Sequence, residues 1–332
     1  MELDKLLTVT ELKVSFTIPR GEIKAVRGVS FQLAQGEILG IVGESGCGKS
    51  VIGQAILGLI PLPPCGVLAG SIKYGSEELI GMKESELVRV RGKKIGIVFQ
   101  DPAAALNPIM KVGKQIVEAI QVGRKLTRKE AVLEALKILE ITGINNPDEI
   151  FHRYPHELSG GLGQRVLVAI ALAGQPEILI ADEPTTALDT MSKVSLVGLL
   201  QELRDDINLT IIFLSHDLVL VARFCHRILV MYAGLVVEEG RAADIFNNPR
   251  HPYLRGLLQC LPNTAGENVF APIQGQPVDP AVLPPGCAFA PRCPERMAVC
   301  QELNPGGFQV AADHIVCCWL FQPGIKGIKK AT

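Results

Sequence analysis

The sequence predicts an α/β fold built around a parallel β-sheet, and three observations favour it. Short apolar runs that end at glycine or polar residues occur at Ile38–Val42, at Ile178–Ala181 and in LTIIFL before Ser215. Such runs are typical of strands that are buried on both faces of a parallel sheet. Helical patterns lie between them, and 33 glycines in 332 residues suit a fold with several tight strand-to-helix turns. A chain of this length holds one large α/β domain and a smaller appendage.

The first of these strands leads into the most informative motif of the chain. Gly43, Gly46, Gly48, Lys49 and Ser50 fill the pattern G-x-x-x-x-G-K-[ST], and a helix is expected from Lys49 to Leu57. Glycines allow successive backbone N–H groups to converge on phosphate oxygens, and the helix N-terminus adds positive potential. Lys49 is expected to reach the β- and γ-phosphates, and Ser50 to bind Mg²⁺. An ordinary glycine-rich turn is the alternative, which the flanking strand and helix disfavour.

Acidic residues end the second strand. Asp182 and Glu183 follow Ile178–Ala181 directly, so one carboxylate is placed to hold Mg²⁺ and the other to polarise an attacking water. His216 ends the third strand, where it is placed to contact the γ-phosphate, although alone it would more often be structural. The sequence therefore predicts a magnesium-dependent site for nucleotide hydrolysis.

A second anion-binding turn is predicted at Ser159, Gly160 and Gly161, which precede a helical run. Alone this turn is no more than a helix cap. Two phosphate-binding turns in one chain suggest nucleotide held between two subunits.

These motifs together resemble those of the ATP-binding-cassette (ABC) ATPases. GESGCGKS, VFQDP, LSGGLGQR, ILIADEPTTALD and LSHD occur in that family's order and spacing, within about Thr8 to Gly240. The resemblance implies a P-loop ABC-type core with an antiparallel β subdomain, an inserted helical subdomain and a small irregular C-terminal extension. It also implies Glu183 as general base, with Lys49, Gln100 and His216 as the other catalytic residues. The residues expected to contact ATP or its Mg²⁺ on this basis are Phe16, Gly43, Glu44, Ser45, Gly46, Cys47, Gly48, Lys49, Ser50, Val51, Gln100, Ser159, Gly160, Gly161, Asp182 and Asp189.

Three positions qualify that assignment. Phe16 stands where the family stacks an aromatic ring on adenine, but it is equally an ordinary core residue. Gly163 stands where relatives carry a larger residue, and a glycine within a helix costs about 1 kcal/mol relative to alanine. Gln100 is expected to sense the γ-phosphate and the metal, which it would help to bind together with Ser50 and Asp182.

The predicted domains are an ABC ATPase domain over 1–246 and a cysteine-containing extension over 247–332. The helical subdomain is expected over about 101–169, with a capping box from Thr127 to Glu130. Two β-like runs flank Ala233-Gly234 and predict a hairpin. NPRHPY and the later cysteines resemble the C-terminal extension of the ATP-binding subunits of oligopeptide/dipeptide importers, a branch whose relatives also transport nickel and other small solutes.

Cysteines cluster in that extension. Cys287, Cys293, Cys300 and Cys318 have the spacing C-x5-C-x6-C-x17-C, which lacks the two-residue gaps of short zinc sites. Four thiolates on irregular loops suit an iron–sulfur cube. The resemblance favours a [4Fe–4S] cluster, with Zn²⁺ and metal-free thiols as alternatives. Cys317 adjoins Cys318, and the family's ending before an aromatic residue favours Cys318.

Composition limits the partners. Lys and Arg total 33 against 34 Asp and Glu, so the net charge of −1 gives no footprint for nucleic acid. The N-terminus does not have the pattern of a signal peptide, and the longest apolar run, around Val51 to Leu62, is too short to span a bilayer. A soluble, cytoplasmic protein is therefore expected, and the resemblance implies that it sits at the cytoplasmic face of a membrane.

The sequence as a whole predicts the ATP-hydrolysing subunit of an ABC importer for peptides or a related small solute. Its expected partners are a second ABC ATPase (a heterodimer is favoured over a homodimer), two transmembrane permease subunits and, indirectly, an extracytoplasmic solute-binding protein. The main alternative is a soluble ABC ATPase acting on nucleic acid or ribosomes, and a third is a module that binds nucleotide without hydrolysing it.

Overall fold

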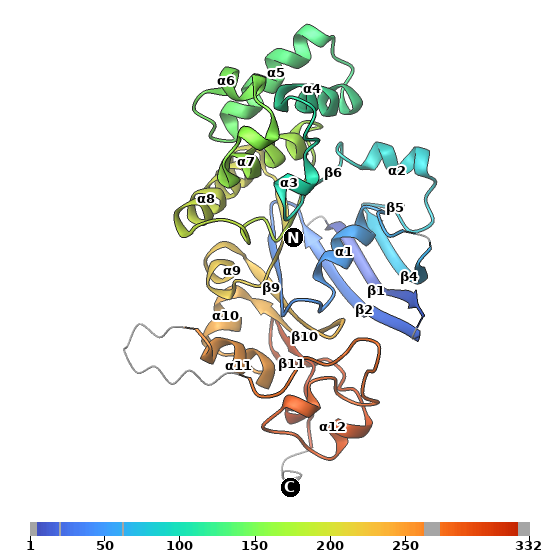
Figure 1. The fold of residues 1–332 in the computed structure, drawn as a ribbon. Coiled ribbons are helices and arrows are strands. Elements are labelled where there is room, and N and C mark those ends of the chain that lie inside the picture. The colour runs from blue at the N-terminus through green and yellow to red at the C-terminus, as the bar shows by residue number, and fades with distance from the viewer. Residues whose placement is uncertain (1–4, 20, 62, 262–272, 325–332) are drawn as a thin grey trace.

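A computed structural model describes residues 5–19, 21–61, 63–261 and 273–324 of the chain. Figure 1 shows an antiparallel sheet, a central sheet, a block of helices above them and a C-terminal segment below. The two sheets pack on helix α1 (Lys49–Ile56), whose apolar side chains lie in the core that the sheets share. This is the α/β architecture that the sequence predicts.

The antiparallel sheet has the strand order β2-β1-β4-β5. Buried residues recur on one face of β1, among them Leu7, Val9, Leu12 and Val14. One face of each strand therefore covers the core while the other faces solvent. The strands are β1 (Lys5–Ile18), β2 (Gly21–Ala34), β4 (Cys65–Tyr74) and β5 (Glu77–Glu78).

The central sheet has the order β11-β12-β10-β9-β3-β8-β7-β6, and its members from β9 to β6 are parallel. Strand β3 lies at its middle, and β3, β7 and β8 are fully buried, which confirms the three strands expected from the apolar runs. The pairing of β9 with β10 confirms the expected hairpin. The strands are β3 (Ile38–Val42), β6 (Ile95–Val98), β7 (Ile178–Asp182), β8 (Thr210–Ser215), β9 (Arg227–Tyr232), β10 (Leu235–Arg241), β11 (Phe308–Ala311) and β12 (His314–Val316).

Five helices and a short 3₁₀ turn occupy the stretch after β6, where a helical block was expected. Thr127 caps α5 and shares a reciprocal capping box with Glu130, as the sequence predicts. Gly163 of α7 has a reason that its helix propensity does not reveal, since an added Cβ would lie 3.0 Å from the Cβ of Pro102 on α3. The helices are α3 (Pro102–Ala105), α4 (Val112–Gly123), α5 (Arg128–Ile141), α6 (Pro147–His152) and α7 (Gly160–Leu172).

The C-terminal extension is small and mostly irregular, as the sequence predicts, and its two short strands continue the central sheet. Strand β12 pairs with β10, and β11 pairs with β12. The physical reason is that β10 would otherwise present an unpaired edge, which a further strand satisfies. The helices that follow the helical block are α8 (Thr190–Ile207), α9 (Leu218–Phe224), α10 (Ala242–Asn247), α11 (Pro252–Gln259) and α12 (Val299–Glu302), and α2 (Glu84–Val90) precedes it.

Glu238 anchors the extension to the sheet. Its carboxylate is fully buried and accepts hydrogen bonds from the backbone N–H of Arg250 (2.9 Å) and of His251 (2.6 Å). It also lies 2.7 Å from Nε2 of His314 on β12. One side chain of β10 therefore fixes both the start of α11 and the last strand of the extension. None of the helices in the described ranges has the length and apolar character needed to cross a bilayer.

Candidate active site

The loop between β3 and α1 has the shape that the glycine pattern predicts. Gly46 and Gly48 have φ angles of 79° and 105°, a region that L side chains rarely adopt. A Cβ on Gly43 would lie 2.3 Å from the carbonyl oxygen of Met231, and one on Gly48 would lie 2.3 Å from that of Ala25. The glycines are therefore required by backbone conformation and by close packing against neighbouring strands.

Lys49 and Ser50 follow this loop at the start of α1. Lys49 is buried, and its Nζ donates to the carbonyl oxygens of Gly43 (2.9 Å) and Glu44 (3.2 Å). The Ser50 hydroxyl donates to the Asp182 carboxylate over 2.8 Å. The tip of β7 therefore meets the beginning of α1, as the two motifs require.

Glu183 lies at the centre of a small polar group. Its backbone φ of 45° is uncommon for a residue with a side chain, and its N–H donates to the carbonyl of Leu214 at the end of β8. One carboxylate oxygen lies 3.4 Å from Lys49 Nζ. The other lies 3.2 Å from His216 Nδ1 and accepts from the Thr186 hydroxyl over 3.1 Å. Strained backbone of this kind is often found at functional sites.

Burial and neighbouring charges shift the pKa values of the Asp182 and Glu183 carboxylates in opposite directions. Burial raises the pKa of Asp182, although the Ser50 hydroxyl and Lys49 act against it. Burial also acts to raise the pKa of Glu183, but Lys49, Thr186 and His216 outweigh it and hold that pKa below its ordinary value. Glu183 is therefore charged near neutral pH and able to accept a proton, while Ser50 and Asp182 present the oxygens that suit Mg²⁺.

Four other predicted residues form no hydrogen bond or ion pair with this group in the described part of the chain. Gln100 is exposed just beyond β6, and its side chain forms no hydrogen bond in the described part of the chain. Ser159 caps α7, where its Oγ accepts from the Leu162 N–H, and Asp189 caps α8 by accepting from Ser192. Figure 1 shows α7 in the upper helical block and α1 beside the antiparallel sheet. Phe16 is half-buried on β1.

Three contacts were missed by sequence reasoning. The Tyr253 hydroxyl accepts from the Glu44 N–H over 3.0 Å, and the Arg292 guanidinium binds the Glu44 carboxylate through two nitrogens. Thr186, inside the quoted motif EPTTALD, supports Glu183. Tyr253 and Arg292 are far from the loop in sequence, and no local pattern links them to it.

The four favoured cysteines line one narrow cavity of about 10 Å³ in the extension. Burial raises the pKa of Cys287, of Cys293 to about 11 and of Cys318 to about 12, so their thiols are neutral at ordinary pH. Within the described residues, no three His, Cys, Asp or Glu side chains form a group that would hold a metal ion. The structure therefore does not itself support the predicted metal centre. The cysteines that line this cavity are Cys287, Cys293, Cys300 and Cys318.

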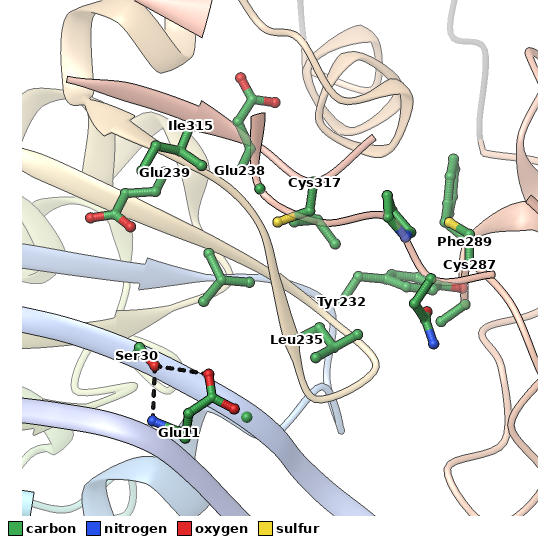
Figure 2. Close-up of a pocket in the computed structure, with 17 residues that line it drawn as sticks. Glu11, Ser30, Tyr232, Leu235, Glu238, Glu239, Cys287, Phe289, Ile315 and Cys317 are labelled. Atoms are coloured by element: carbon green, nitrogen blue, oxygen red, sulfur yellow. Dashed lines mark hydrogen bonds between the residues drawn. The ribbon is translucent and has the colours of Figure 1, made fainter. Parts of the chain in front are cut away.

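Cys317 belongs to another cavity, of about 360 Å³, which also reaches Cys287. Figure 2 shows Cys317 there beside β10, with Glu11 and Ser30 of the antiparallel sheet on the opposite wall. Adjacent residues of an extended chain point to opposite sides, and this alternation separates Cys317 from Cys318.

Two family models match the chain. The model described as ABC transporter matches residues 26–186, and the model described as oligopeptide/dipeptide transporter, C-terminal region, matches residues 237–300. The first match includes strands β3, β6 and β7 of the central sheet, and the second begins within β10.

Curated relatives match over nearly the full chain. The oligopeptide transport ATP-binding protein OppD of Bacillus subtilis is 45% identical, over 97% of this chain and 91% of its own length. The dipeptide transport ATP-binding protein DppD of the same organism is 44% identical, over 96% and 95% respectively. OppD of Escherichia coli is 42% identical, over 92% and 90%.

Solved structures share the fold. The dimeric ATP-binding cassette MJ0796 in a post-hydrolysis state with ADP and Pi superposes with a TM-score of 0.64 at 26% identity, over 71% of this chain and 98% of that one. CbiO1 of Clostridium perfringens, part of the transporter complex cbiONQ, has a TM-score of 0.63 at 30% identity, over 74% and 92%.

Proposed function

This chain belongs to the ABC transporter family, among the ATP-binding proteins with an oligopeptide/dipeptide-type C-terminal region, and we propose that it powers a peptide importer by hydrolysing ATP. The observation that carries the proposal is the meeting of Lys49, Glu183 and His216 at the end of the phosphate-binding loop. The curated relatives are oligopeptide and dipeptide transport proteins, which disfavours the alternative role on nucleic acid or ribosomes.

The proposed chemistry assigns one task to each residue. The loop N–H groups and Lys49 stabilise charge that develops on the γ-phosphate. Glu183 accepts a proton from the attacking water, and His216 orients the Glu183 carboxylate and the water. Mg²⁺, when bound by Ser50 and Asp182, supplies Lewis-acid polarisation of the phosphate oxygens.

A test of this mechanism is the turnover of ATP by the full chain together with its permease subunits. Glu183→Gln is expected to lower kcat by about 100-fold or more while ATP still binds, because the amide cannot accept the proton. Glu177→Gln is the matched control, since Glu177 precedes β7 at its other end and pairs with Lys94 at the surface over 2.8 Å. Undiminished turnover by Glu183→Gln would contradict the assignment, and no turnover by the unsubstituted protein would favour a nucleotide-binding module without hydrolysis.

We also propose that ATP is held between two cassettes. In this arrangement Ser159, Gly161 and Asp189 of each chain face the nucleotide on the opposing chain. Within the described residues, none of the three forms a hydrogen bond with the loop of its own chain. A heterodimer with a second ATPase is favoured over a homodimer. Gln100 then links the nucleotide to the membrane partner.

The helical block offers a docking surface for a permease subunit. Ile109 is 82% exposed and lies beside a hollow of about 540 Å³ that Lys111, Phe151 and Tyr154 also line. Exposed apolar side chains beside a hollow are typical of protein interfaces. The proposed location is therefore the cytoplasmic face of a membrane, through these partners.

Co-purification with tagged permease subunits tests this surface. Ile109→Asp is expected to reduce recovery of the complex. Ile141→Asp provides the control, because Ile141 is 57% exposed on the same block but does not line the hollow. Equal recovery of both variants would contradict the docking surface.

A [4Fe–4S] cluster on the extension is the proposed cofactor, with Zn²⁺ as the alternative. The proposal rests on the resemblance, which implies such a cluster, and on the place of Cys287, Cys293, Cys300 and Cys318 in the lining of one cavity. Four cysteine sulfurs are the donor set of such a cluster, and these side chains would have to turn toward one another to form it. Binding requires the thiols to lose their protons, and the free energy of binding then stabilises the segment. Iron, sulfide and zinc analysis of protein purified without oxygen tests it, with Cys293→Ser expected to lose the metal and Cys317→Ser to keep it.

A further inference from the structure

The C-terminal extension contacts the phosphate-binding loop of its own chain through residue Glu44. Arg292 donates from two guanidinium nitrogens to the two Glu44 carboxylate oxygens, over 2.8 and 3.2 Å. The Arg292 side chain is only 6% exposed, and that of Glu44 is 25% exposed. A bidentate, partly buried pair of this kind fixes orientation as well as distance.

Residue 44 is held from a second direction by Tyr253. The Tyr253 hydroxyl accepts from the Glu44 N–H over 3.0 Å, and its ring is completely buried. The carbonyl oxygen of Glu44 in turn accepts from Lys49 Nζ. The N–H, the side chain and the carbonyl of Glu44 therefore all form hydrogen bonds. The N–H and the side chain bond to residues of the extension, and the carbonyl bonds to Lys49.

Aromatic rings join these contacts to the cysteine-containing segment. The ring of Tyr232 lies 4.7 Å from that of Tyr253 and 5.3 Å from that of Phe289, between ring centroids. The Arg292 guanidinium lies over the Tyr232 ring, 5.9 Å from its centroid. Phe289 and Arg292 both fall between Cys287 and Cys293 in sequence. The segment between Cys287 and Cys293 is thus connected to the loop directly through Arg292, and through the packed rings of Phe289, Tyr232 and Tyr253.

We propose that the extension holds the phosphate-binding loop of its own chain in the shape that accepts ATP, with Arg292 and Tyr253 as positioning residues. The proposal rests on the proposed ATP-binding function of the loop. Loss of either contact releases Glu44 and allows the loop to adopt other shapes. Part of the free energy of ATP binding is then used to order the loop, and the affinity for ATP falls. Bound ATP restores the shape of the loop, so Lys49 and the loop N–H groups again meet the γ-phosphate, and the chemical step in the bound state is unaffected.

The expected signature is therefore in ATP affinity and not in the rate of the chemical step. In Arg292→Gln, the Kd and KM for ATP are expected to rise about ten-fold, the equivalent of one charge-assisted hydrogen bond, with kcat unchanged. Arg292→Lys keeps the charge but not the two-pronged contact and is expected to recover part of the affinity. Arg255→Gln is the matched control, because Arg255 pairs with Glu295 in the same extension over 2.8 Å and does not touch the loop.

The experiment measures fluorescent ATP binding by the full chain carrying Glu183→Gln, so that no nucleotide is consumed, and ATP turnover by the same variants with Glu183 intact, which gives kcat and KM. Arg292→Gln and Glu44→Gln are combined in a double-mutant cycle, and the double variant is expected to bind no more weakly than the worse single one. Where Arg292→Gln fails to fold, Tyr253→Phe replaces it, since it removes only the hydroxyl that the Glu44 N–H contacts.

Unchanged affinity in Arg292→Gln or Tyr253→Phe, or additive effects in the double variant, would overturn the proposal. A fall in kcat at unchanged KM would also overturn it, because the extension would then act on the chemical step. Failure of the unsubstituted chain to bind ATP is a different result, which rejects the proposed function itself.

Discussion

Glu238→Gln is expected to lower the free energy of unfolding of the extension from the central sheet by about 2.5 to 6 kcal/mol. Glu238 is fully buried and His314 is 2% exposed, so water does not replace what the substitution removes. Glutamine has one acceptor oxygen, and in either orientation its NH₂ group faces the N–H of Arg250 or of His251. One buried backbone donor is then unsatisfied, which costs about 1 to 3 kcal/mol, and the charge-assisted contact with His314 is lost at about 1.5 to 3 kcal/mol.

The only tryptophan of the chain makes this measurement specific. Trp319 lies in the extension, where its Nε1–H donates to the carbonyl of Leu303 over 2.9 Å. Urea unfolding followed by tryptophan fluorescence therefore reports on the extension, and the change in midpoint at constant slope gives the loss of stability.

Glu239→Gln is the matched control on the same strand. The Glu239 side chain is 23% exposed and pairs with Arg227, which keeps its contact with Glu37. A partly exposed pair of this kind contributes about 1 kcal/mol or less. Equal midpoints for Glu238→Gln and Glu239→Gln would refute the reasoning that the buried carboxylate anchors the extension.

Two further predictions follow from buried titratable groups. Burial raises the pKa of Asp182, so the charged form of this side chain destabilises the folded protein at pH values above the usual Asp range. Asp182→Asn still accepts the hydrogen bond from Ser50 and is expected to raise the urea midpoint of the nucleotide-free protein while abolishing Mg²⁺-dependent hydrolysis. A lowered midpoint would contradict this. Burial, with Arg255, lowers the pKa of His251 from 6.5 to about 3, so the stability it contributes is complete above pH 6.5 and is lost as the pH falls towards 3. Acidification from about pH 7 to about pH 4 is expected to lower the free energy of unfolding by roughly 3 kcal/mol through this group. His251→Asn keeps an acceptor for the Tyr253 N–H and is expected to make the urea midpoint depend less steeply on pH. An unchanged dependence on pH would contradict this prediction.

The sequence was sufficient for features that are set by adjacent residues. The phosphate-binding loop depends on glycines at fixed offsets and on the strand and helix that flank it, so the pattern from Gly43 to Ser50 predicts its shape directly. Buried strands such as β7 and β8 follow from apolar composition, because a strand covered on both faces has no polar side to show. The parallel arrangement then brings the polar residues at their ends, Asp182 and Glu183 for β7 and His216 for β8, to the loop.

Tertiary structure decided what depends on residues distant in sequence. Arg292 and Glu44 are 248 positions apart, and His314 and Glu238 are 76 apart. No local pattern reveals either pair, because each forms only after the strand order is set and β12 has been added to β10. The choice of Cys318 over Cys317 for the four-cysteine cavity, expected only from resemblance, likewise acquires its physical basis in the direction of each side chain in the folded extension. The shape of the ATP-binding loop follows from steric limits on adjacent residues and can be read from the sequence. The contacts of the extension with that loop depend on packing between residues far apart in the chain, so only the tertiary structure reveals them.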